Sequence, residues 1–218
     1  MLALTNYDYV VFDCDGVVLD SNKIKSDVFR SVLKRYPSRE VEEFIDYHER
    51  HGGISRQEKL LHFFTKILGQ ETPLDYADVL EDFGQQCTIA LAKSGLVPGV
   101  FKYLERIYAL DLPMFIVSGG SEKEIKAVFK EKNIDHFFNA ICGNPAPKRD
   151  GLKGLIESGR AQGLGAYFGD AKLDYQLAQE FGLDFCFVAG FSEWEDGLRF
   201  CERRNIVCVT DFNELLTE

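Results

Sequence analysis

Residues 7–21 read YDYVVFDCDGVVLDS, a short apolar run followed at once by clustered carboxylates. The run from Tyr9 to Phe12 is β-branched and aromatic and is bounded by turn residues, which is typical of a strand buried on both faces. Asp13 and Asp15 come where that strand should end. Side chains two positions apart on an extended backbone point the same way, so both carboxylates are expected to face one site. Gly16 lets the chain turn away directly after them.

Two carboxylates at one strand end repel each other unless a cation lies between them or one of them holds a proton. The pair therefore favours a hard divalent cation with oxygen ligands, and Mg²⁺ is the expected one. The alternative is a surface turn with solvated Asp side chains. The apolar residues Val17, Val18 and Leu19 directly beyond the acids argue against that alternative, because a surface turn has no need of them.

Length and composition limit the classes of protein to consider. The 218 residues are enough for one large domain or for a core with a modest insertion. The chain is 45% hydrophobic and 28% charged, as expected of a soluble globular protein, and its net charge is −10. An acidic chain without a basic cluster is a poor candidate for binding nucleic acid or an anionic membrane surface. A small anionic substrate would need a metal or local positive groups.

The cysteines and the hydropathy of the chain indicate the cellular compartment in which the protein works. The six cysteines show no Cys-x-x-Cys spacing and mostly have apolar neighbours, so we expect reduced, buried thiols and neither a disulfide framework nor a zinc site. No segment has the pattern of a signal peptide or the length of a membrane span. These features predict a cytoplasmic protein and leave its oligomeric state open.

The periodicity of the chain changes twice. Residues 21–93 carry the apolar spacing of helices and contain no convincing strand. After residue 93, helices alternate with short apolar strands at 113–117, 140–142, 165–168, 184–188 and 206–209. Such alternation predicts a parallel sheet with helices on both faces. We therefore expect an α/β fold, with a Rossmann-like parallel-sheet core formed by residues 1–20 and 94–218 and an inserted all-helical cap at 21–93.

Ligands of such sheets bind beyond the carboxyl ends of the strands, and further polar groups stand at those ends. Ser118-Gly119-Gly120-Ser121 follows a strand and opens a helix, where free backbone N–H groups and glycines make an anion site. Ser121 can cap that helix while Ser118 binds phosphate. Lys148 lies in a proline-containing loop after the next strand, a position where a lysine on its own is usually solvated. Lys153 is its rival but should lie inside the following helix.

Gly169 and Asp170 end another predicted strand, and Asp174 comes four residues after Asp170, one turn along the helix that starts there. Both carboxylates can then face the same cation. Alternatively, Asp170 caps the helix and Asp174 is a surface acid. Either role is plausible for one of these residues taken alone.

In this order, the four groups resemble the motifs of the haloacid dehalogenase-like hydrolases. Residues 13–21 match the first motif throughout, Ser118 the second, Lys148 the third, and residues 169–174 the fourth, Gly-Asp-x-x-x-Asp. The resemblance is to the subgroup of phosphoglycolate phosphatases and β-phosphoglucomutases, which carry a helical cap. Small departures are Cys14 between the acids and Lys25 in the first cap helix, where mutases of this family often carry His.

The resemblance implies roles for these side chains. Asp13 is the nucleophile that takes up a phosphoryl group, Asp15 is the general acid and base, and Lys148 neutralises charge. Ser118 and the Gly119 N–H bind phosphoryl oxygens. The carboxylates of Asp13, Asp15, Asp170 and Asp174 are the implied Mg²⁺ site, with Asp174 acting through water or by orienting the site.

The implied reaction is Mg²⁺-dependent hydrolysis of a small phosphate monoester, a sugar phosphate or similar metabolite, through an aspartyl phosphate. Asp15 argues against a dehalogenase, because dehalogenases of this family lack an acid there. A sugar phosphomutase of the β-phosphoglucomutase type would use the same site but depend on a bisphosphate. A receiver-type signalling domain would have no helical cap. A non-catalytic phosphoacceptor or binding module would have lost Asp13 or Asp15.

The predicted cap carries one further resemblance. Residues 52–56, Gly-Gly-Ile-Ser-Arg, resemble a turn in the caps of hexose-phosphate mutases and related phosphatases, where the Arg reaches a distal phosphate or other anionic group. Arg56 is therefore a candidate for binding the substrate. Equally, it could pair with an acid on its own helix. His48 and His51 are expected at the cap surface.

Overall fold

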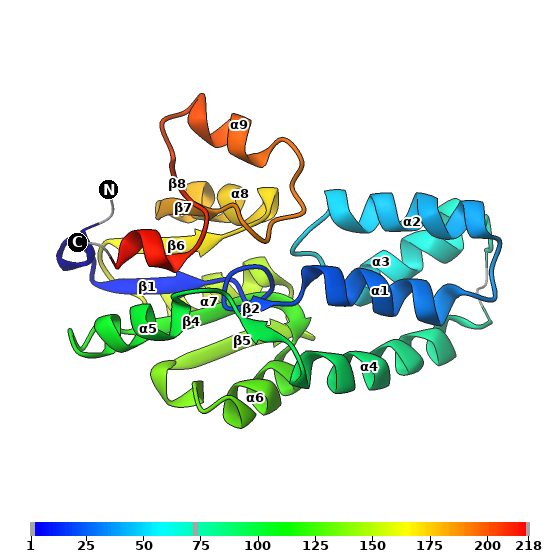
Figure 1. Ribbon diagram of the computed structural model, residues 1–218, viewed down its shortest axis with the longest axis horizontal. Helices are drawn as coiled ribbons and strands as arrows, with labels where there is room; N and C mark the ends of the chain where they lie inside the picture. Colours follow the sequence, from blue (N-terminus) through cyan, green and yellow to red (C-terminus); the bar gives the residue numbers. More distant parts are fainter. Residues whose placement is uncertain (1–2, 72–73, 217–218) are drawn as a thin grey trace.

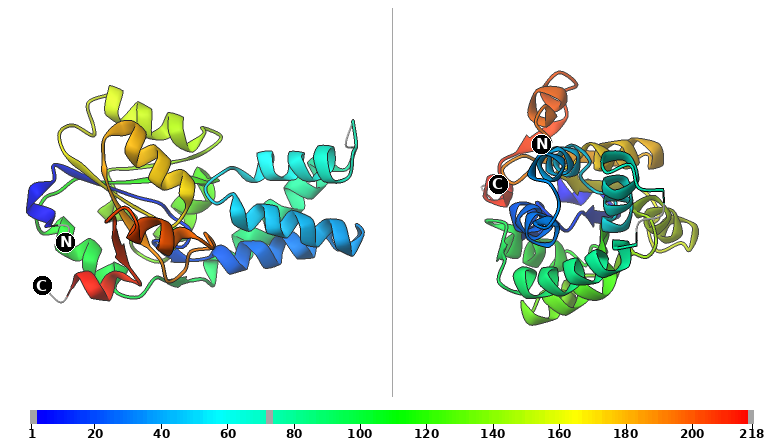
Figure 2. Two further views of the ribbon diagram at one scale, coloured as in Figure 1. Left: turned by 90° about the horizontal axis from the view of Figure 1, so that it is seen from above. Right: turned by 90° about the vertical axis from the view of Figure 1, so that its right-hand side faces the viewer.

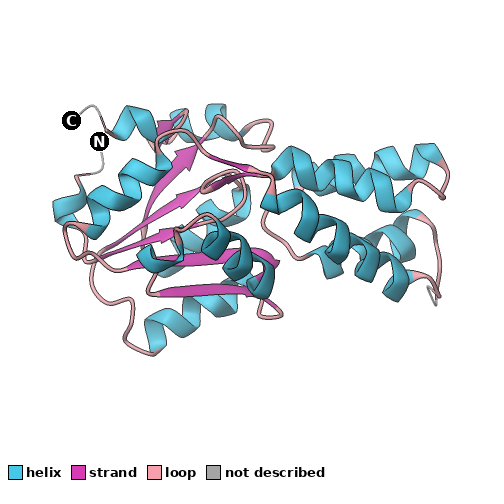
Figure 3. Ribbon diagram, turned by 60° about the horizontal axis from the view of Figure 1, so that its bottom comes forward, coloured by secondary structure: helices cyan, strands magenta, loops and turns pink. Residues whose placement is uncertain are grey.

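The computed structural model describes residues 3–71 and 74–216, and within them the largest sheet has six strands, all parallel, in the order β5-β4-β1-β6-β7-β8 (Figure 3). The strands are β1 (Tyr9–Phe12), β4 (Met114–Ser121), β5 (Ala140–Asn144), β6 (Gly165–Gly169), β7 (Asp184–Val188) and β8 (Val207–Val209). The first strand lies in the middle of the sheet because it pairs with both β4 and β6. The predicted α/β fold with a Rossmann-like core is confirmed.

Every residue of β1 is buried, as its apolar sequence predicted, because helices cover both faces of the sheet. Val10 and Phe12 point to one face, which is covered by α5 (Val100–Tyr108), α6 (Glu122–Glu131) and the turn η4 (Phe212–Leu215). Tyr9 and Val11 point to the other, which is covered by α7 (Lys148–Glu157), α8 (Lys172–Phe181) and α9 (Gly197–Glu202). Alternation along one strand therefore divides the core into two layers.

A bundle of helices, which we call the cap, stands beyond the carboxyl ends of the strands (Figure 1). It consists of α1 (Asn22–Leu33), α2 (Ser38–Arg50), α3 (Arg56–His62), the π-helical turn η2 (Phe63–Ile67) and α4 (Tyr76–Ala92). Its interior is aromatic: the Phe29 ring packs edge-on against Phe44 and stacks on Phe83. The right-hand view in Figure 2 looks at the cap end-on, with its helices in front of the sheet. The division at residues 20/21 and 93/94 stays a prediction.

Two short antiparallel strands, β2 (Leu19–Asp20) and β3 (Gly95–Leu96), join the cap to the sheet. The chain therefore enters and leaves the cap at neighbouring points. Short 3₁₀ turns, η1 (Leu4–Asn6) and η3 (Asp135–Phe137), complete the elements.

The structure differs from the expected element boundaries in two places. Strand β4 continues through the Ser-Gly-Gly-Ser segment, with an irregularity in its pairing between Val117 and Ser121. The helix expected between the strands at 184–188 and 206–209 is short and starts only at Gly197. Trp194 lies in the preceding loop because its ring packs on Phe187 and Phe200, which partly buries it without a helix.

Two further expectations concern the cysteines, predicted to be free and buried, and the absence of a membrane-spanning segment. All six cysteines lie in the described ranges and are free, four of them buried and two half-buried. In the described part of the chain, no helix combines the length and the apolar character needed to cross a bilayer.

Candidate active site

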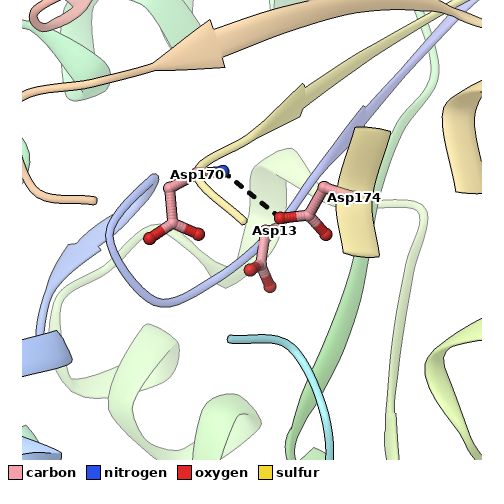
Figure 4. A group of neighbouring side chains, drawn as sticks. All are labelled: Asp13, Asp170 and Asp174. Atoms are coloured by element: carbon pink, nitrogen blue, oxygen red, sulfur yellow. Dashed lines mark hydrogen bonds between the residues drawn. The ribbon is translucent and has the colours of Figure 1, made fainter. Parts of the chain in front are cut away.

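Three buried carboxylates meet at the carboxyl end of the central strands. Asp13 follows β1, Asp170 follows β6, and Asp174 lies in the first turn of α8 (Figure 4). The strands bring Asp13 and Asp170 to the same edge, because Phe12 pairs with Phe168 and the Asp13 N–H donates to the Phe168 carbonyl at 2.9 Å. One oxygen of each carboxylate lies within 4.8 Å of the others.

Asp174 is fully buried and both of its oxygens are occupied by protein donors. Oδ1 accepts from Lys148 Nζ at 2.5 Å and from the Tyr167 hydroxyl at 3.1 Å. Oδ2 accepts from the backbone N–H groups of Asp170 at 3.2 Å and Ala171 at 3.0 Å. The carboxylate therefore fixes the loop after β6 and orients the lysine.

Lys148 begins α7 and reaches the centre of the acid cluster. Its Nζ lies 2.9 Å from Asp13 Oδ2, and its side chain is only 1% exposed. Burial favours the neutral amine, but the charges of Asp13 and Asp174 outweigh it and hold the pKa of Lys148 well above its usual value. The rival Lys153 is exposed and pairs with Glu157 on its own helix at 3.5 Å.

One ammonium does not balance three buried carboxylates. Burial raises the pKa of Asp13 to about 7. The negative charges of Asp174 and Asp15 add to this rise, and the positive charge of Lys148 opposes it. Burial and the charges of Asp13 and Asp174 also raise the pKa of Asp170 well above its usual value. Excess negative charge and hard oxygen ligands are what a divalent cation such as Mg²⁺ requires, so the donor set fits this metal.

Asp15 lies outside the three-carboxylate cluster, because its oxygens have other partners. Oδ1 accepts from the Ser21 hydroxyl at 2.6 Å, and Oδ2 forms an ion pair with Lys25 of α1. Burial alone would raise the pKa of Asp15, but Lys25 and Ser21 outweigh it, so that the pKa lies below its usual value. Sequence reasoning assigned no role to Lys25, because its spacing from Asp15 offers no signal for this contact.

The segment after the apolar part of β4 lies directly beneath the cap. The Ser118 hydroxyl oxygen accepts from the Gly120 N–H at 3.0 Å, and Ser121 caps α6 by accepting from the Glu124 N–H at 3.4 Å. A Cβ on Gly119 would lie 2.2 Å from the Gly53 carbonyl oxygen. Only glycine therefore lets the cap approach this closely.

Arg56 connects the cap to the core. Its guanidinium forms a two-pronged ion pair with Glu124 of α6, including an Nη1 to Oε1 distance of 3.0 Å, and lies over the Phe83 ring at 5.0 Å. The expected alternative of an acid on its own helix is wrong. The partner comes from 68 residues away, and the pair is nearly buried, with 10% and 16% of the side chains exposed.

His48 was expected at the surface, but it is buried, because it extends the apolar face of α2 and packs on the Phe29 ring at 4.7 Å. Its Nδ1 lies 2.6 Å from Nζ of Lys59, which is also buried. The Lys59 Nζ donates in addition to the His48 carbonyl at 3.1 Å. His51 is exposed, as predicted. Sequence reasoning missed Lys59, since a lysine in a short helix is usually solvated.

A cavity between cap and core joins these groups. Its wall includes Asp13, Asp15 and Gly119 from the core and Lys25, His48 and Lys59 from the cap. The cavity therefore brings the acids of the core and the basic groups of the cap to one space.

A Rossmann-like sheet that gathers buried carboxylates at its strand ends beneath a helical cap is the architecture of a capped hydrolase with an acidic centre. The chain belongs to the haloacid dehalogenase-like hydrolases, because residues 10–188 match the model of that family. It is an enzyme of the phosphatase type, as predicted. Family membership and the cap contradict the reading as a receiver-type signalling domain.

Individual relatives agree with this assignment. A phosphoglycolate phosphatase from Rhodobacter capsulatus is 24% identical over an alignment of 189 residues, and the match covers 81% of each chain. The solved structure of a predicted phosphoglycolate phosphatase from Haemophilus somnus aligns with a TM-score of 0.77 at 18% identity, covering 99% of both chains. A hydrolase of the same family from Streptococcus pneumoniae aligns with a TM-score of 0.73 at 20% identity, covering 98% of both.

The buried lysine of the cap predicts a pH effect on stability. Burial and the charge of Lys25 lower the pKa of Lys59 from 10.5 to about 7. Between these pH values the unfolded chain binds more protons at this residue than the folded chain, so Lys59 favours folding more as the pH rises. We expect Lys59→Met to stabilise the protein near pH 7, with a gain that shrinks by a few kcal/mol towards pH 9.5. Urea unfolding of both proteins at the two pH values measures this difference.

The control is Lys66→Met, which removes an exposed lysine of η2. Its free energy of unfolding should differ from that of the wild type by the same small amount at both pH values. If Lys59→Met raises the free energy of unfolding by the same amount at both pH values, Lys59 titrates normally in the folded protein.

Proposed function

We propose that the protein is a Mg²⁺-dependent phosphatase that hydrolyses a small phosphate monoester through an aspartyl phosphate on Asp13. The observation that supports it most directly is the position of Asp13: its carboxylate contacts Lys148 and opens on the cavity that Asp15 also lines. The relative from Rhodobacter capsulatus bears the name of a phosphatase acting on a small phosphate monoester.

Asp13 and Asp170 are the direct metal ligands in this proposal. The full predicted set also contains Asp15 and Asp174, but Lys25 pairs with Asp15 outside the cluster, and four protein donors engage Asp174. Asp13 and Asp170 have fewer donors than Asp174, because Lys148 and the Cys14 N–H contact Asp13 and Asn22 donates to Asp170 Oδ2 at 2.6 Å. Mg²⁺ bound here supplies positive charge that favours the ionised form of Asp13 and offsets charge on the phosphoryl oxygens.

The Asp13 carboxylate attacks phosphorus, and the Lys148 ammonium stabilises the negative charge that the phosphoryl group brings. Ser118 accepts from the Gly120 N–H, so its own hydroxyl proton is free to be donated to a phosphoryl oxygen. The Gly119 N–H provides a second donor on the same segment. Asp174 takes part by holding Lys148 in place.

Asp15 serves both halves of the reaction. It protonates the departing alcohol in the first half and deprotonates the attacking water in the second. The contacts with Lys25 and Ser21 stabilise the carboxylate form, which is the form that the second half requires. For the first half Asp15 must hold a proton, so its contact with Lys25 has to loosen when substrate is bound.

Phosphate release from p-nitrophenyl phosphate and a panel of sugar, nucleotide and small-acid phosphates tests the proposal. We expect turnover with Mg²⁺, loss to the uncatalysed background with a chelator, and recovery on adding excess Mg²⁺. Equal rates with and without chelator would contradict the role of the metal. Turnover that requires a bisphosphate and converts one sugar phosphate into another would favour the phosphomutase instead.

A further inference from the structure

The cavity contains a buried basic pair that the proposed chemistry does not use. Lys59 and His48 come from α3 and α2, are 4% and 5% exposed, and both contribute to the cavity wall. An ammonium can only donate, so when Lys59 is protonated its contact with His48 Nδ1 places the imidazole proton on Nε2. Among the described residues, Nε2 has no hydrogen-bond partner. The pair therefore presents an unused N–H donor on each side chain.

Other basic groups of the cap that line the cavity wall are neutralised by the protein itself. Lys25 pairs with Asp15, and Arg56 pairs with Glu124. Lys59 forms no ion pair with any residue that the structure describes. A buried charge without a counter-ion is costly, whereas an anion placed against it would recover that cost.

The charged groups around the pair leave it available to a ligand. Lys25 disfavours the protonated form of Lys59, while the charges of Glu193, Asp15 and Asp170 favour it. Glu193 accepts from the Ser26 hydroxyl at 3.1 Å and lines the same cavity. These acids act on Lys59 through the field of the cavity and form no ion pair with it.

We propose that the His48–Lys59 pair is a subsite for a carboxylate on the alcohol part of the substrate. This inference rests on the proposed function, because it concerns the group that leaves when Asp13 takes up the phosphoryl group. The carboxylate would accept from the free N–H of the Lys59 ammonium, and His48 would hold that ammonium in place through its Nδ1.

Charge favours a carboxylate over a second phosphate group. The pair carries one positive charge, which matches the single charge of a carboxylate. A phosphate dianion would bring excess charge next to Glu193 and Asp15, which also line the cavity.

The test compares phosphoglycolate with glycolamide phosphate, which has the same shape but no carboxylate, and with ethylene glycol bisphosphate. For the wild type we expect kcat/KM for phosphoglycolate to be about 100-fold above that for the amide. In Lys59→Met the ratio should fall to near unity, while the rate with the amide changes less than about threefold. His48→Gln should lower the ratio about tenfold. Lys66→Met, which removes an exposed lysine of η2, should leave it unchanged.

Two results would overturn the subsite: a wild type that does not distinguish the acid from the amide, or a preference that survives in Lys59→Met. A preference for the bisphosphate would assign the pair to a phosphate instead. If no monoester is hydrolysed, the proposed function fails on its own. Calorimetry then decides on the subsite, because tighter binding of phosphoglycolate than of the amide must still disappear in Lys59→Met and persist in Lys66→Met.

Discussion

Replacing Asp13 by Asn is expected to lower kcat for phosphate release by at least about four orders of magnitude. The amide has the size of the carboxylate but lacks the charge and nucleophilicity needed to attack phosphorus. The substitution also removes one of three buried negative charges around Lys148, so we expect the folded protein to be retained. Steady-state phosphate release measures the rate, and thermal unfolding verifies the fold.

Asp20→Asn is the matched control, because Asp20 belongs to the same sequence motif but its side chain is exposed. Its activity should stay within about twofold of the wild type, as expected for a surface substitution away from the site. An Asp13→Asn protein that keeps a tenth or so of the wild-type rate would show that another group attacks phosphorus.

Lys148→Met is expected to damage both catalysis and folding. It removes the only ammonium in direct contact with Asp13 and Asp174 among the described residues, at 2.9 and 2.5 Å. Because breaking a buried ion pair leaves an uncompensated charge, we expect the free energy of unfolding without metal to fall by about 3–5 kcal/mol. Loss of a preorganised cation at the transferring group should lower kcat about 1,000-fold. Urea unfolding in chelator and phosphate release with Mg²⁺ measure the two effects.

A second substitution separates the two effects. Adding Asp13→Asn to Lys148→Met should restore part of the lost stability, since one unpaired carboxylate disappears, without restoring any activity. Lys153→Met removes an exposed lysine of the same helix and should change stability by less than about 0.5 kcal/mol. If the midpoint of urea unfolding is the same for Lys148→Met and the wild type, the Lys148 ammonium does not balance the buried carboxylates.

The sheet and the acid cluster could be predicted because both follow from local patterns. An apolar run such as Tyr9 to Phe12 is stable only when buried on both faces, and the acids that follow such runs must meet where parallel strands end. Tyr167 marks the limit of this reasoning. Its position in an apolar strand predicted burial, but nothing local indicated that its hydroxyl would contact Asp174.

The contacts between cap and core could not be predicted, since they depend on how two distant parts of the chain dock. Arg56 has its partner in α6, and Lys25 reaches Asp15 only because α1 lies over the end of β1. His48 and Lys59 resembled surface residues because amphipathic helices normally turn such groups to solvent. Here both side chains are buried and line the cavity between cap and core.

Mass spectrometry of the peptide that contains Asp13, after acid quench within one turnover, tests the central claim most directly. Wild type and Asp15→Asn are each mixed with Mg²⁺ and p-nitrophenyl phosphate, whose phenolate leaves without the proton that Asp15 supplies to an alcohol. We expect one phosphoryl group on Asp13 in both, more abundant in Asp15→Asn because its second half-reaction is slowed. Phosphate release by the wild type with Asp13 unmodified at every quench time, in both proteins, would contradict an aspartyl phosphate at this residue.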